Sequence, residues 1–358
     1  MRRLFLLIAA ATLLVSGPAI ARTWNIEHDG TGDAPTILAG IDSASAGDTV
    51  LVLQGTYHEH DIHLKSGVLL TAQHSIRDLV VIDALGQGRV LVFDGVDATC
   101  RVQYLTLTGG HATGTGSDGS GGGVFCTNYS APAIHICYFH NNTADNLGGG
   151  AYCEDHSSPT FSSGVFYENQ AGVGGGGIAC RSYSNPSFDY STLKGNWSAN
   201  GGGLYCSDNS SPALGFCTFL NCLGSGMGGG MYSEGGSTPS LTRCIIGFSA
   251  DGEGAYADDD GSIPAFNCCD IYGNEGGDWV GRIASQNNTV GNFTQDPLFC
   301  DTLEVESGLS VEACSPCVFG NHPAGAFCGA QIGNTYPDCG CGEATEPSTW
   351  GAVKSLYR

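Results

Sequence analysis

The apolar residues between positions 121 and 274 recur with a fixed period. Each repeat opens on three glycines or a degraded form of that phrase, continues with an aliphatic residue, and usually adds an aromatic residue and then Cys. The openings lie 24–27 residues apart, at Gly121, Gly148, Gly175, Gly201, Gly228 and Gly252. Such a period is typical of solenoids, in which each repeat buries its apolar face only against its neighbours.

Alternation within the repeat predicts which side chains face the core. The aliphatic fourth position and the small sixth position share one face of a strand, so the fifth position should face outward. This outward column holds Phe125, Tyr152, Ala179, Tyr205, Tyr232 and Tyr256. A second strand supplies further apolar columns and is followed by an Asn column at Asn142, Asn169, Asn196 and Asn274. Stacked Asn side chains can form a hydrogen-bonded ladder between turns.

The region before the repeats reads as the start of the same solenoid. Residues 35–44 predict a short amphipathic helix that covers the open end, and Val/Ile/Leu-rich strands follow. Four phrases resemble the secreted right-handed parallel β-helix proteins of the pectin-lyase type: Pro35-Thr36-Ile37, Ala46-Gly47-Asp48-Thr49-Val50, Gly55-Thr56-Tyr57 and Leu105-Thr106-Leu107-Thr108-Gly109-Gly110. The resemblance covers residues 24–275 and implies a fold, not an activity.

The repeats carry a second resemblance. Their Gly-Gly-Gly-aliphatic and Phe-x-x-Asn phrases are similar to the repeats of polymorphic outer-membrane proteins, which are surface adhesins and autotransporters. The match is in the repeat unit only. The expected fold is an all-β, right-handed parallel β-helix of about nine to ten turns, with an N-terminal helical cap and a Cys-rich C-terminal cap.

The N-terminus predicts export. Arg2 and Arg3 precede an apolar run, and Ala19-Ile20-Ala21 is a small-x-small cleavage site, so residues 1–21 read as a signal peptide. We expect the β-helix over 22–275, with regular repeats over 121–275, and the Cys-rich cap over 276–341. The tail over 342–358 reads as a sorting tag or a frayed terminus. We expect a secreted or bacterial cell-surface protein with no transmembrane segment after signal cleavage.

The charge narrows the choice of partners. The chain has 35 acidic and 13 basic residues, a formal net charge of −22. This balance argues against nucleic acid, whose phosphates need Lys and Arg. It is compatible with a highly solvated surface or with divalent cations. With nucleic acid excluded, we expect a polysaccharide or a cell-surface partner.

The 17 cysteines fall into two groups. Cysteines that stack on successive turns, such as Cys126 and Cys153, are close enough for disulfides, or they fill the core as small apolar residues. Export favours disulfides in the C-terminal region, although the spacing there also resembles metal ligands. The C-terminal disulfide candidates are Cys300, Cys314, Cys317, Cys328, Cys339 and Cys341.

One acidic cluster suggests a cation. Asp258, Asp259 and Asp260 follow a repeat strand, with Glu234 and Asp208 one and two turns back. Stacked carboxylates repel one another unless neutralised, so Ca²⁺ bound between turns is physically sensible. The alternative is a solvated acidic turn. We expect that the protein requires no cofactor, and Ca²⁺ is the one cofactor that the sequence suggests.

The outward aromatic column is the leading candidate for binding. Its rings at Phe125, Tyr152, Tyr205, Tyr232 and Tyr256 would form an exposed apolar stripe, which calls for a partner. Tyr rings beside acids and Asn suit sugar rings. Alternatively, the rings stack on one another and only stabilise the sheet. This column favours a non-catalytic protein of surface structure, adhesion or polysaccharide binding.

An enzyme is the alternative. The pectin-lyase type that the chain resembles includes polysaccharide lyases, which need an Arg or Lys base beside Ca²⁺-bound carboxylates, and hydrolases, which need two or three carboxylates at a fixed separation. The repeats hold few bases, Arg181, Lys194 and Arg243, at unlike positions. We therefore assign no catalytic residue. The candidates for a carbohydrate lyase or hydrolase are Asp155, Asp189, Asp208 and Asp258–Asp260.

Overall fold

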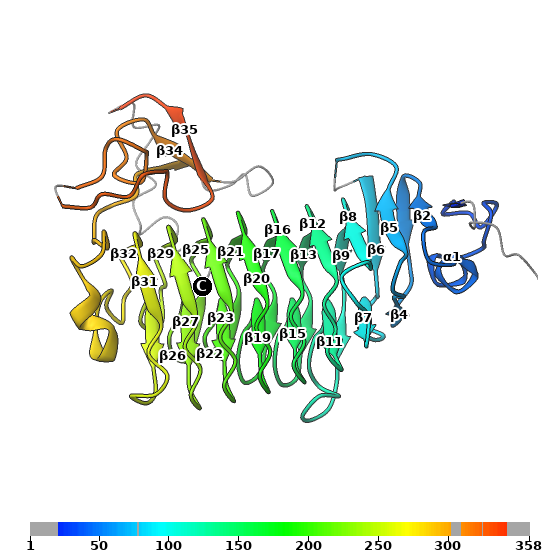
Figure 1. Ribbon diagram of the computed structural model, residues 1–358, viewed down its shortest axis with the longest axis horizontal. Coiled ribbons are helices and arrows are strands. Elements are labelled where there is room, and N and C mark those ends of the chain that lie inside the picture. Colours follow the sequence, from blue (N-terminus) through cyan, green and yellow to red (C-terminus); the bar gives the residue numbers. More distant parts are fainter. Residues whose placement is uncertain (1–20, 77–78, 302–308, 324, 342–358) are drawn as a thin grey trace, which may run out of the picture.

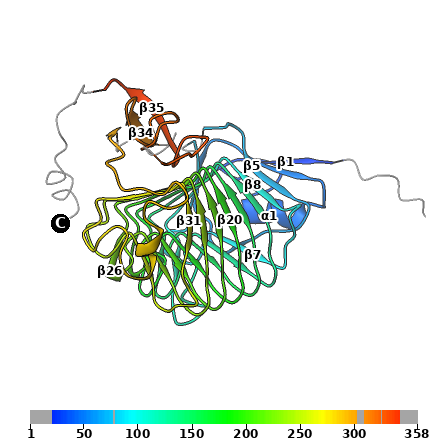
Figure 2. The same cartoon turned by 60° about the vertical axis from the view of Figure 1, so that its left-hand side comes forward.

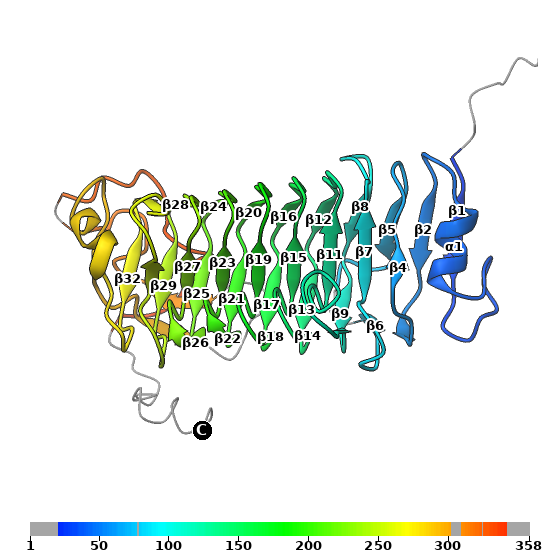
Figure 3. The same cartoon turned by 90° about the horizontal axis from the view of Figure 1, so that it is seen from below.

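The protein is a long rod of parallel strands coiled around one core (Figures 1 and 3). The computed structural model describes residues 21–76, 79–301, 309–323 and 325–341. The predicted signal peptide and the tail after residue 341 lie outside these residues, apart from position 21. The longest sheet has ten strands, and a bridge from Asp270 to Phe293 begins a further turn. The β-helix prediction is confirmed, with about eleven turns, slightly more than expected.

Each full turn contributes one strand to each of three long sheets, and some turns add a strand to a fourth. The ten-stranded sheet contains β1 (Thr23–Ile26), β2 (Thr49–Val52), β5 (Leu69–Ala72), β8 (Arg101–Gln103), β12 (Ala133–His135), β16 (Thr160–Ser162), β20 (Ser187–Asp189), β24 (Ala213–Gly215), β28 (Ser240–Thr242) and β31 (Ala265–Asn267). The nine-stranded sheet contains β3 (Gly55–Tyr57), β6 (Val80–Asp83), β9 (Thr106–Thr108), β13 (Tyr138–His140), β17 (Val165–Tyr167), β21 (Thr192–Lys194), β25 (Thr218–Leu220), β29 (Ile245–Gly247) and β32 (Asp270–Tyr272). The eight-stranded sheet contains β4 (Ile62–His63), β7 (Leu91–Asp94), β11 (Val124–Thr127), β15 (Ala151–Cys153), β19 (Ile178–Cys180), β23 (Leu204–Cys206), β27 (Met231–Ser233) and β30 (Ala255–Ala257). The five-stranded sheet contains β10 (His111–Ala112), β14 (Thr143–Ala144), β18 (Gln170–Ala171), β22 (Trp197–Asn200) and β26 (Leu223–Met227).

The N-terminal end is covered by the expected helix, α1 (Ile37–Ser43). The Thr36 hydroxyl accepts from the N–H of Ala39, and the Glu59 carboxylate accepts from the N–H groups of Ile37 and Leu38. These bonds satisfy donors that the first helical turn leaves open. Ile37 and Ile41 are fully buried against the core. The helix therefore closes the apolar interior of the first turn.

The core consists of stacked identical positions, as the columns predict. Phe139 stacks on Phe166 with ring centroids 4.5 Å apart. The Asn ladder is also present: the Asn142 side-chain amide donates to Oδ1 of Asn169 at 3.1 Å, and Asn169 donates to Asn196 at 3.0 Å. Because these buried amides find partners on the next turn, they cost little to bury and fix the register of the turns.

The glycine phrase is a turn that only glycine fits. Gly148 has φ +65°, a left-handed conformation that favours glycine. A Cβ on Gly149 would lie 2.4 Å from the carbonyl oxygen of Gln170 on the next turn. The chain therefore needs bare backbone here to stack one turn on the next.

A buried serine ladder supports the turn at the other end of the strands that follow the glycine phrase. This ladder was not predicted from the sequence. The backbone N–H of each serine but the last donates to the hydroxyl of the serine one turn further on, for example Ser157 to Ser184 at 3.1 Å. Its members stand two residues before the recurring Pro and are fully buried: Ser130, Ser157, Ser184, Ser210 and Ser237. The signal was the Ser-x-Pro spacing itself.

The C-terminal region does more than cover the end of the rod. Trp279 and Ile283, the latter in the 3-10 helix η2 (Gly281–Gln286), join the core cluster and close the last turn. The following segment instead folds back along the side of the rod (Figures 1 and 2). It forms a three-stranded sheet of β33 (Phe299–Asp301), β34 (Leu309–Glu312) and β35 (Thr335–Cys339). The expectation that all of 276–341 caps the end is therefore wrong for this part.

The folded-back segment lies on the nine-stranded sheet because that face offers it apolar side chains. Leu309 packs against Val165 and Leu220, which point outward from the rod. Asn334 donates its N–H to the Thr218 hydroxyl at 2.9 Å and its side-chain amide to the Thr192 hydroxyl at 3.1 Å.

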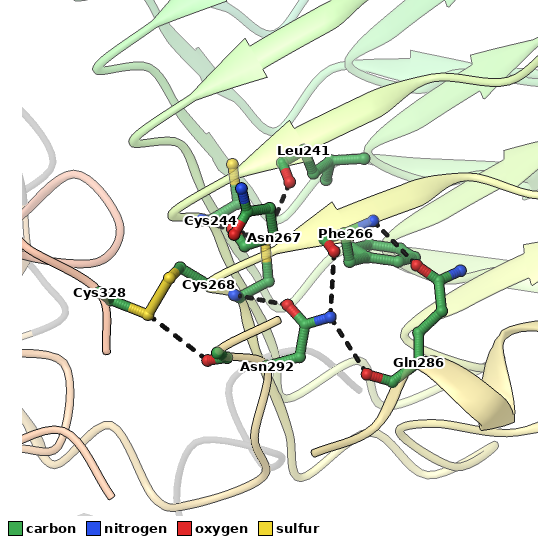
Figure 4. The surroundings of a disulfide bond; sticks show 10 residues. Leu241, Cys244, Phe266, Asn267, Cys268, Gln286, Asn292 and Cys328 are labelled. Atoms are coloured by element: carbon green, nitrogen blue, oxygen red, sulfur yellow. Dashed lines mark hydrogen bonds between the residues drawn. A yellow bond between two sulfur atoms is a disulfide. The ribbon is translucent and has the colours of Figure 1, made fainter. Parts of the chain in front are cut away.

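Three disulfides stabilise this region: Cys268–Cys328, Cys300–Cys339 and Cys314–Cys341. The first ties the segment to the rod (Figure 4). Five of the six predicted cysteines are confirmed. The prediction for Cys317 is wrong, because this residue is a buried free thiol that donates to Oδ2 of Asp270 at 3.5 Å. The stacked core cysteines are free thiols that fill the interior, rather than disulfides.

Candidate functional site

The outward aromatic column lies on the eight-stranded sheet, whose strands β4, β7, β11, β15, β19, β23 and β27 are labelled in Figure 3. We call Phe125, Tyr152, Tyr205, Tyr232 and Tyr256 the covered column. Its rings stack: the centroids of Phe125 and Tyr152 lie 5.9 Å apart, and those of Tyr205 and Tyr232 lie 5.6 Å apart. Tyr152 is only 1% exposed, and Tyr205 and Tyr232 are 7% exposed. The predicted exposed stripe is therefore wrong, and the stacking alternative is confirmed.

Neighbouring segments cover the column. Leu147, in the loop after β14, packs with Tyr152 and Tyr205 in one apolar cluster. The guanidinium of Arg89 lies over Phe125, 4.4 Å from the ring centroid. The sequence indicated the direction of the rings correctly but gave no sign of what lies on top of them. The binding role assigned to the column stays a prediction, and only the edges of the column are open to a ligand.

An exposed aromatic ladder lies four residues further along three consecutive repeats. Tyr129 stacks on His156 at 4.8 Å, and His156 stacks on Tyr183 at 5.3 Å. Tyr129 is 64% and Tyr183 is 53% exposed. We call these three residues the surface ladder. The ladder was not predicted from the sequence, although its constant offset from the outward column was a readable signal.

The covered column is interrupted at Ala179. Arg181 follows it by two residues, and its Nε donates to Oδ2 of Asp208 at 2.7 Å. This hydrogen bond raises the pKa of Arg181, and the negative charge of Asp208 acts in the same direction. Arg181 thus places a non-repeating guanidinium beside the interruption in the stack.

A small cleft opens beside Arg181. It has a volume of about 200 Å³, and we call it the mid-rod cleft; its lining is Asn146, Leu147, Val173, Arg181, Tyr205, Ser207, Asp208 and Glu234. The surface ladder leads to its edge, because the N–H of Tyr183 donates to the carbonyl of Asp208 at 3.0 Å. The cleft therefore combines apolar side chains, a guanidinium and two carboxyl groups next to exposed rings.

The tyrosines and Glu234 form the fixed part of this lining. Glu234 accepts from the hydroxyl of Tyr205 and, at 3.4 Å, from that of Tyr232. Burial raises the pKa of Tyr205 well above its usual range, and the hydrogen bond to Glu234 adds to the effect. The Tyr205 hydroxyl is therefore a donor at any physiological pH.

Four of the five carboxylates predicted to hold Ca²⁺ are engaged by other partners. Asp259 accepts from the N–H groups of Gly235 and Gly261 and from the Ser262 hydroxyl. Asp260 pairs with Arg282 at 2.8 Å. Asp208 pairs with Arg181, and Glu234 accepts from the tyrosine hydroxyls. Asp258 is not joined to them in a ligand set: within the described part of the chain, no three His, Cys, Asp or Glu residues are grouped to hold a metal ion.

The enzyme candidates are scattered. Asp189 lies on β20 of the ten-stranded sheet, on a different face from Asp208. Asp155 lies in the turn after β15, where its Oδ1 is 3.3 Å from Nδ1 of His156. The structure instead brings Asp208 together with Glu234, a pair that the sequence did not single out for catalysis.

Comparison with known proteins identifies a family. The family model described as "right handed beta helix region" matches residues 68–246 and 122–294. No curated protein is similar in sequence. Similar solved structures include a mannuronic acid specific polysaccharide family 6 lyase from human gut microbiota, with 13% identity over 72% of this chain and 63% of that chain and a TM-score of 0.48.

Two further solved structures have similar values. The pectate lyase Pel9A is 13% identical over 78% of this chain and 83% of its own, with a TM-score of 0.49. The pectin methylesterase PemA from Erwinia chrysanthemi is 12% identical over 76% of this chain and 92% of its own, with a TM-score of 0.46. The chain spans less than two thirds of the family 6 lyase. Since the family model covers more than half of the sequence, the chain belongs to the right-handed β-helix family.

Proposed function

We propose that this protein is an exported β-helix that binds a polysaccharide without chemical turnover, in surface structure or adhesion. The observation that carries the proposal is the surface ladder, which runs along the rod to Tyr183, a residue bonded through its N–H to the carbonyl of Asp208 in the lining of the mid-rod cleft. Sugar residues present apolar faces and hydroxyl edges, so they need both apolar side chains and hydrogen-bonding groups. The ladder and the cleft supply both, on a scaffold of stacked strands that holds them at fixed spacing.

Each part has a role in this proposal. Val173, 44% exposed, and Leu147 provide apolar contact within the cleft. Asp208 and Glu234 accept hydrogen bonds from sugar hydroxyls, and Asn146 can donate as well as accept. Tyr183 and His156 extend the surface along the polymer. A cleft of about 200 Å³ has room for about one sugar ring, so the chain of the ligand must continue over the ladder.

The proposed location outside the cell follows from the signal peptide that the sequence predicts. The disulfides of the C-terminal region are consistent with an oxidising compartment. No helix in the described ranges has the length and hydropathy needed to cross a membrane.

A glycan array probed with the mature chain tests the proposal. We expect binding to a polysaccharide that falls at least about tenfold, or about 1.4 kcal/mol, in the Tyr183→Ala variant. Tyr190→Ala is the matched control, because Tyr190 is 49% exposed and stacks on Phe216 at 4.7 Å, outside the cleft. No glycan binding, or an equal loss in both variants, would contradict the proposal.

A second candidate function is a carbohydrate lyase or glycoside hydrolase. One observation favours it: Asp208 and Glu234 line the same cleft as Arg181, so acidic groups and a base meet at a non-repeating point. Glycoside hydrolysis uses two carboxyl groups. Incubation with pectic, alginate-like and neutral polymers, followed by reducing-end and 235 nm absorbance assays, would detect it. Product formation that disappears in Glu234→Gln would replace the non-catalytic proposal.

A further inference from the structure

The charges at the mid-rod cleft restrict the class of sugar that it can accept. The lining carries one guanidinium, Arg181, against two carboxylates, Asp208 and Glu234. Arg181 is already paired with Asp208 at 2.7 Å. The remaining carboxylate, Glu234, accepts from tyrosine hydroxyls, which carry no positive charge. The cleft therefore has a net negative charge.

The other arginines along this face are also engaged. Arg89 donates to the carbonyls of Ser120 and Asp118 and covers Phe125. Arg282 pairs with Asp260 at 2.8 Å and donates to the Ala257 carbonyl at 3.0 Å. A polymer with a carboxylate on each sugar would have to displace these partners in order to gain a charged contact.

Acidic groups continue along the path of the ligand. Asp155 adjoins His156 of the surface ladder, and its side chain is 52% exposed. Glu154 lies nearby and accepts from the hydroxyls of Ser117 and Tyr152. The whole chain carries a net charge of −22, so its long-range field also repels polyanions.

From these charges, and resting on the proposed function, we infer that the cleft selects a sugar without a carboxylate whose hydroxyl or amino groups donate to Asp208 and Glu234. Polymers of uronic acids are selected against. Neutral and amino sugars share this donor chemistry, because O–H and N–H groups both meet carboxylate acceptors.

Binding of three oligomers to the mature chain tests the inference: cellohexaose, a glucosamine hexamer and hexagalacturonate. At low salt we expect the neutral or the amino oligomer to bind at least about tenfold more tightly than the acidic one. The discrimination should narrow as the ionic strength rises, because salt screens repulsion between exposed charges.

Variants separate the inference from the proposed function. The double variant Asp208→Asn/Glu234→Gln should bind hexagalacturonate more tightly and thus lose discrimination. Asp189→Asn, on the ten-stranded sheet, is the control and should keep it. Hexagalacturonate binding as tightly as the others, in a manner sensitive to Tyr183→Ala, would overturn the inference and leave the proposed function standing. Failure of all three oligomers to bind would overturn the inference, and absence of any binding on the glycan array as well would overturn the proposed function.

Discussion

Two long faces of the rod carry outward tyrosines, and they are covered in different ways. On the nine-stranded sheet, Tyr138 and Tyr167 stack at 6.3 Å and lie in one apolar cluster with Leu309 of the folded-back segment. On the eight-stranded sheet, the covered column is buried by short loops of the rod itself, and the mid-rod cleft remains open beside Arg181. An outward aromatic residue on a β-helix therefore indicates burial under a cover as readily as it indicates a ligand.

The largest effect should separate the covered column from the surface ladder. Tyr152→Ala removes a ring that is 1% exposed, and we expect a loss of about 3–5 kcal/mol in the free energy of unfolding. Tyr183→Ala, at a position 53% exposed, should cost less than about 1 kcal/mol. Urea unfolding followed by circular dichroism measures both. Equal losses would mean that the two sets of rings do not differ in burial in solution.

The second test concerns the cover on the nine-stranded sheet. Replacing Cys268 and Cys328 with Ser removes the disulfide that ties the segment to the rod. We expect about 2–4 kcal/mol less stability for the attachment of this segment. Limited proteolysis should then cleave within 299–341 while the rod stays intact, and glycan binding should be unchanged. Loss of binding in this variant would place part of the ligand site on the folded-back segment.

The third test uses pH at the junction between rod and segment. Asp270 is fully buried beside Cys317, and burial raises its pKa well above the usual value. The protonated carboxyl suits the folded state, so its stabilisation is complete below the unfolded pKa, about 3.9, and is lost as pH rises toward the folded pKa.

Asp270→Asn removes this titration. We expect the variant to be more stable than the parent at pH 8, with the difference disappearing near pH 4, as measured by urea unfolding at both values. The same stability difference at both pH values would show that Asp270 does not titrate across this range. Asp258→Asn, in an exposed turn of the rod, is a suitable control.

The smallest effect concerns the edge of the cleft. Tyr205→Phe removes the hydroxyl that donates to Glu234, and we expect a loss of about 1 kcal/mol in unfolding free energy. Tyr190→Phe, at an exposed position, should change nothing measurable. If Tyr205→Phe is also neutral, the hydroxyl has equivalent water partners and the cleft is more open than its lining indicates.

Periodicity predicted the fold because a solenoid repeats the same contacts on every turn. The inward columns, the Asn142–Asn169 ladder and the N-terminal helix were all readable from spacing alone. The cover on Tyr152 was not, because strand alternation gives the direction of a side chain but not which loop lies over it. The pairing of Cys268 with Cys328 was also unreadable, since it joins a repeat position to the segment that folds back.

Arg181 shows what remains hidden in a repeat. Its position was noted as unlike those of the other bases, yet its meaning depended on Ala179, two residues earlier. A small residue in an aromatic column and a charged residue just after it together mark the point where the rod departs from its repeat. The Ser ladder is hidden for the opposite reason: it is as regular as the columns, but small polar side chains next to a recurring Pro are equally typical of an exposed turn.

The amide ladder has a consequence for how such a rod changes length. Asn142 and Asn169 each donate to an identical residue one turn away, so a turn duplicated in this stretch would bring both the donor and the acceptor that its neighbours need. Insertion or loss of a whole turn thus leaves the register of the rest untouched. The molecule can act as a graduated spacer, lengthened in steps of about 4.8 Å, while the position of its cleft relative to one end stays constant.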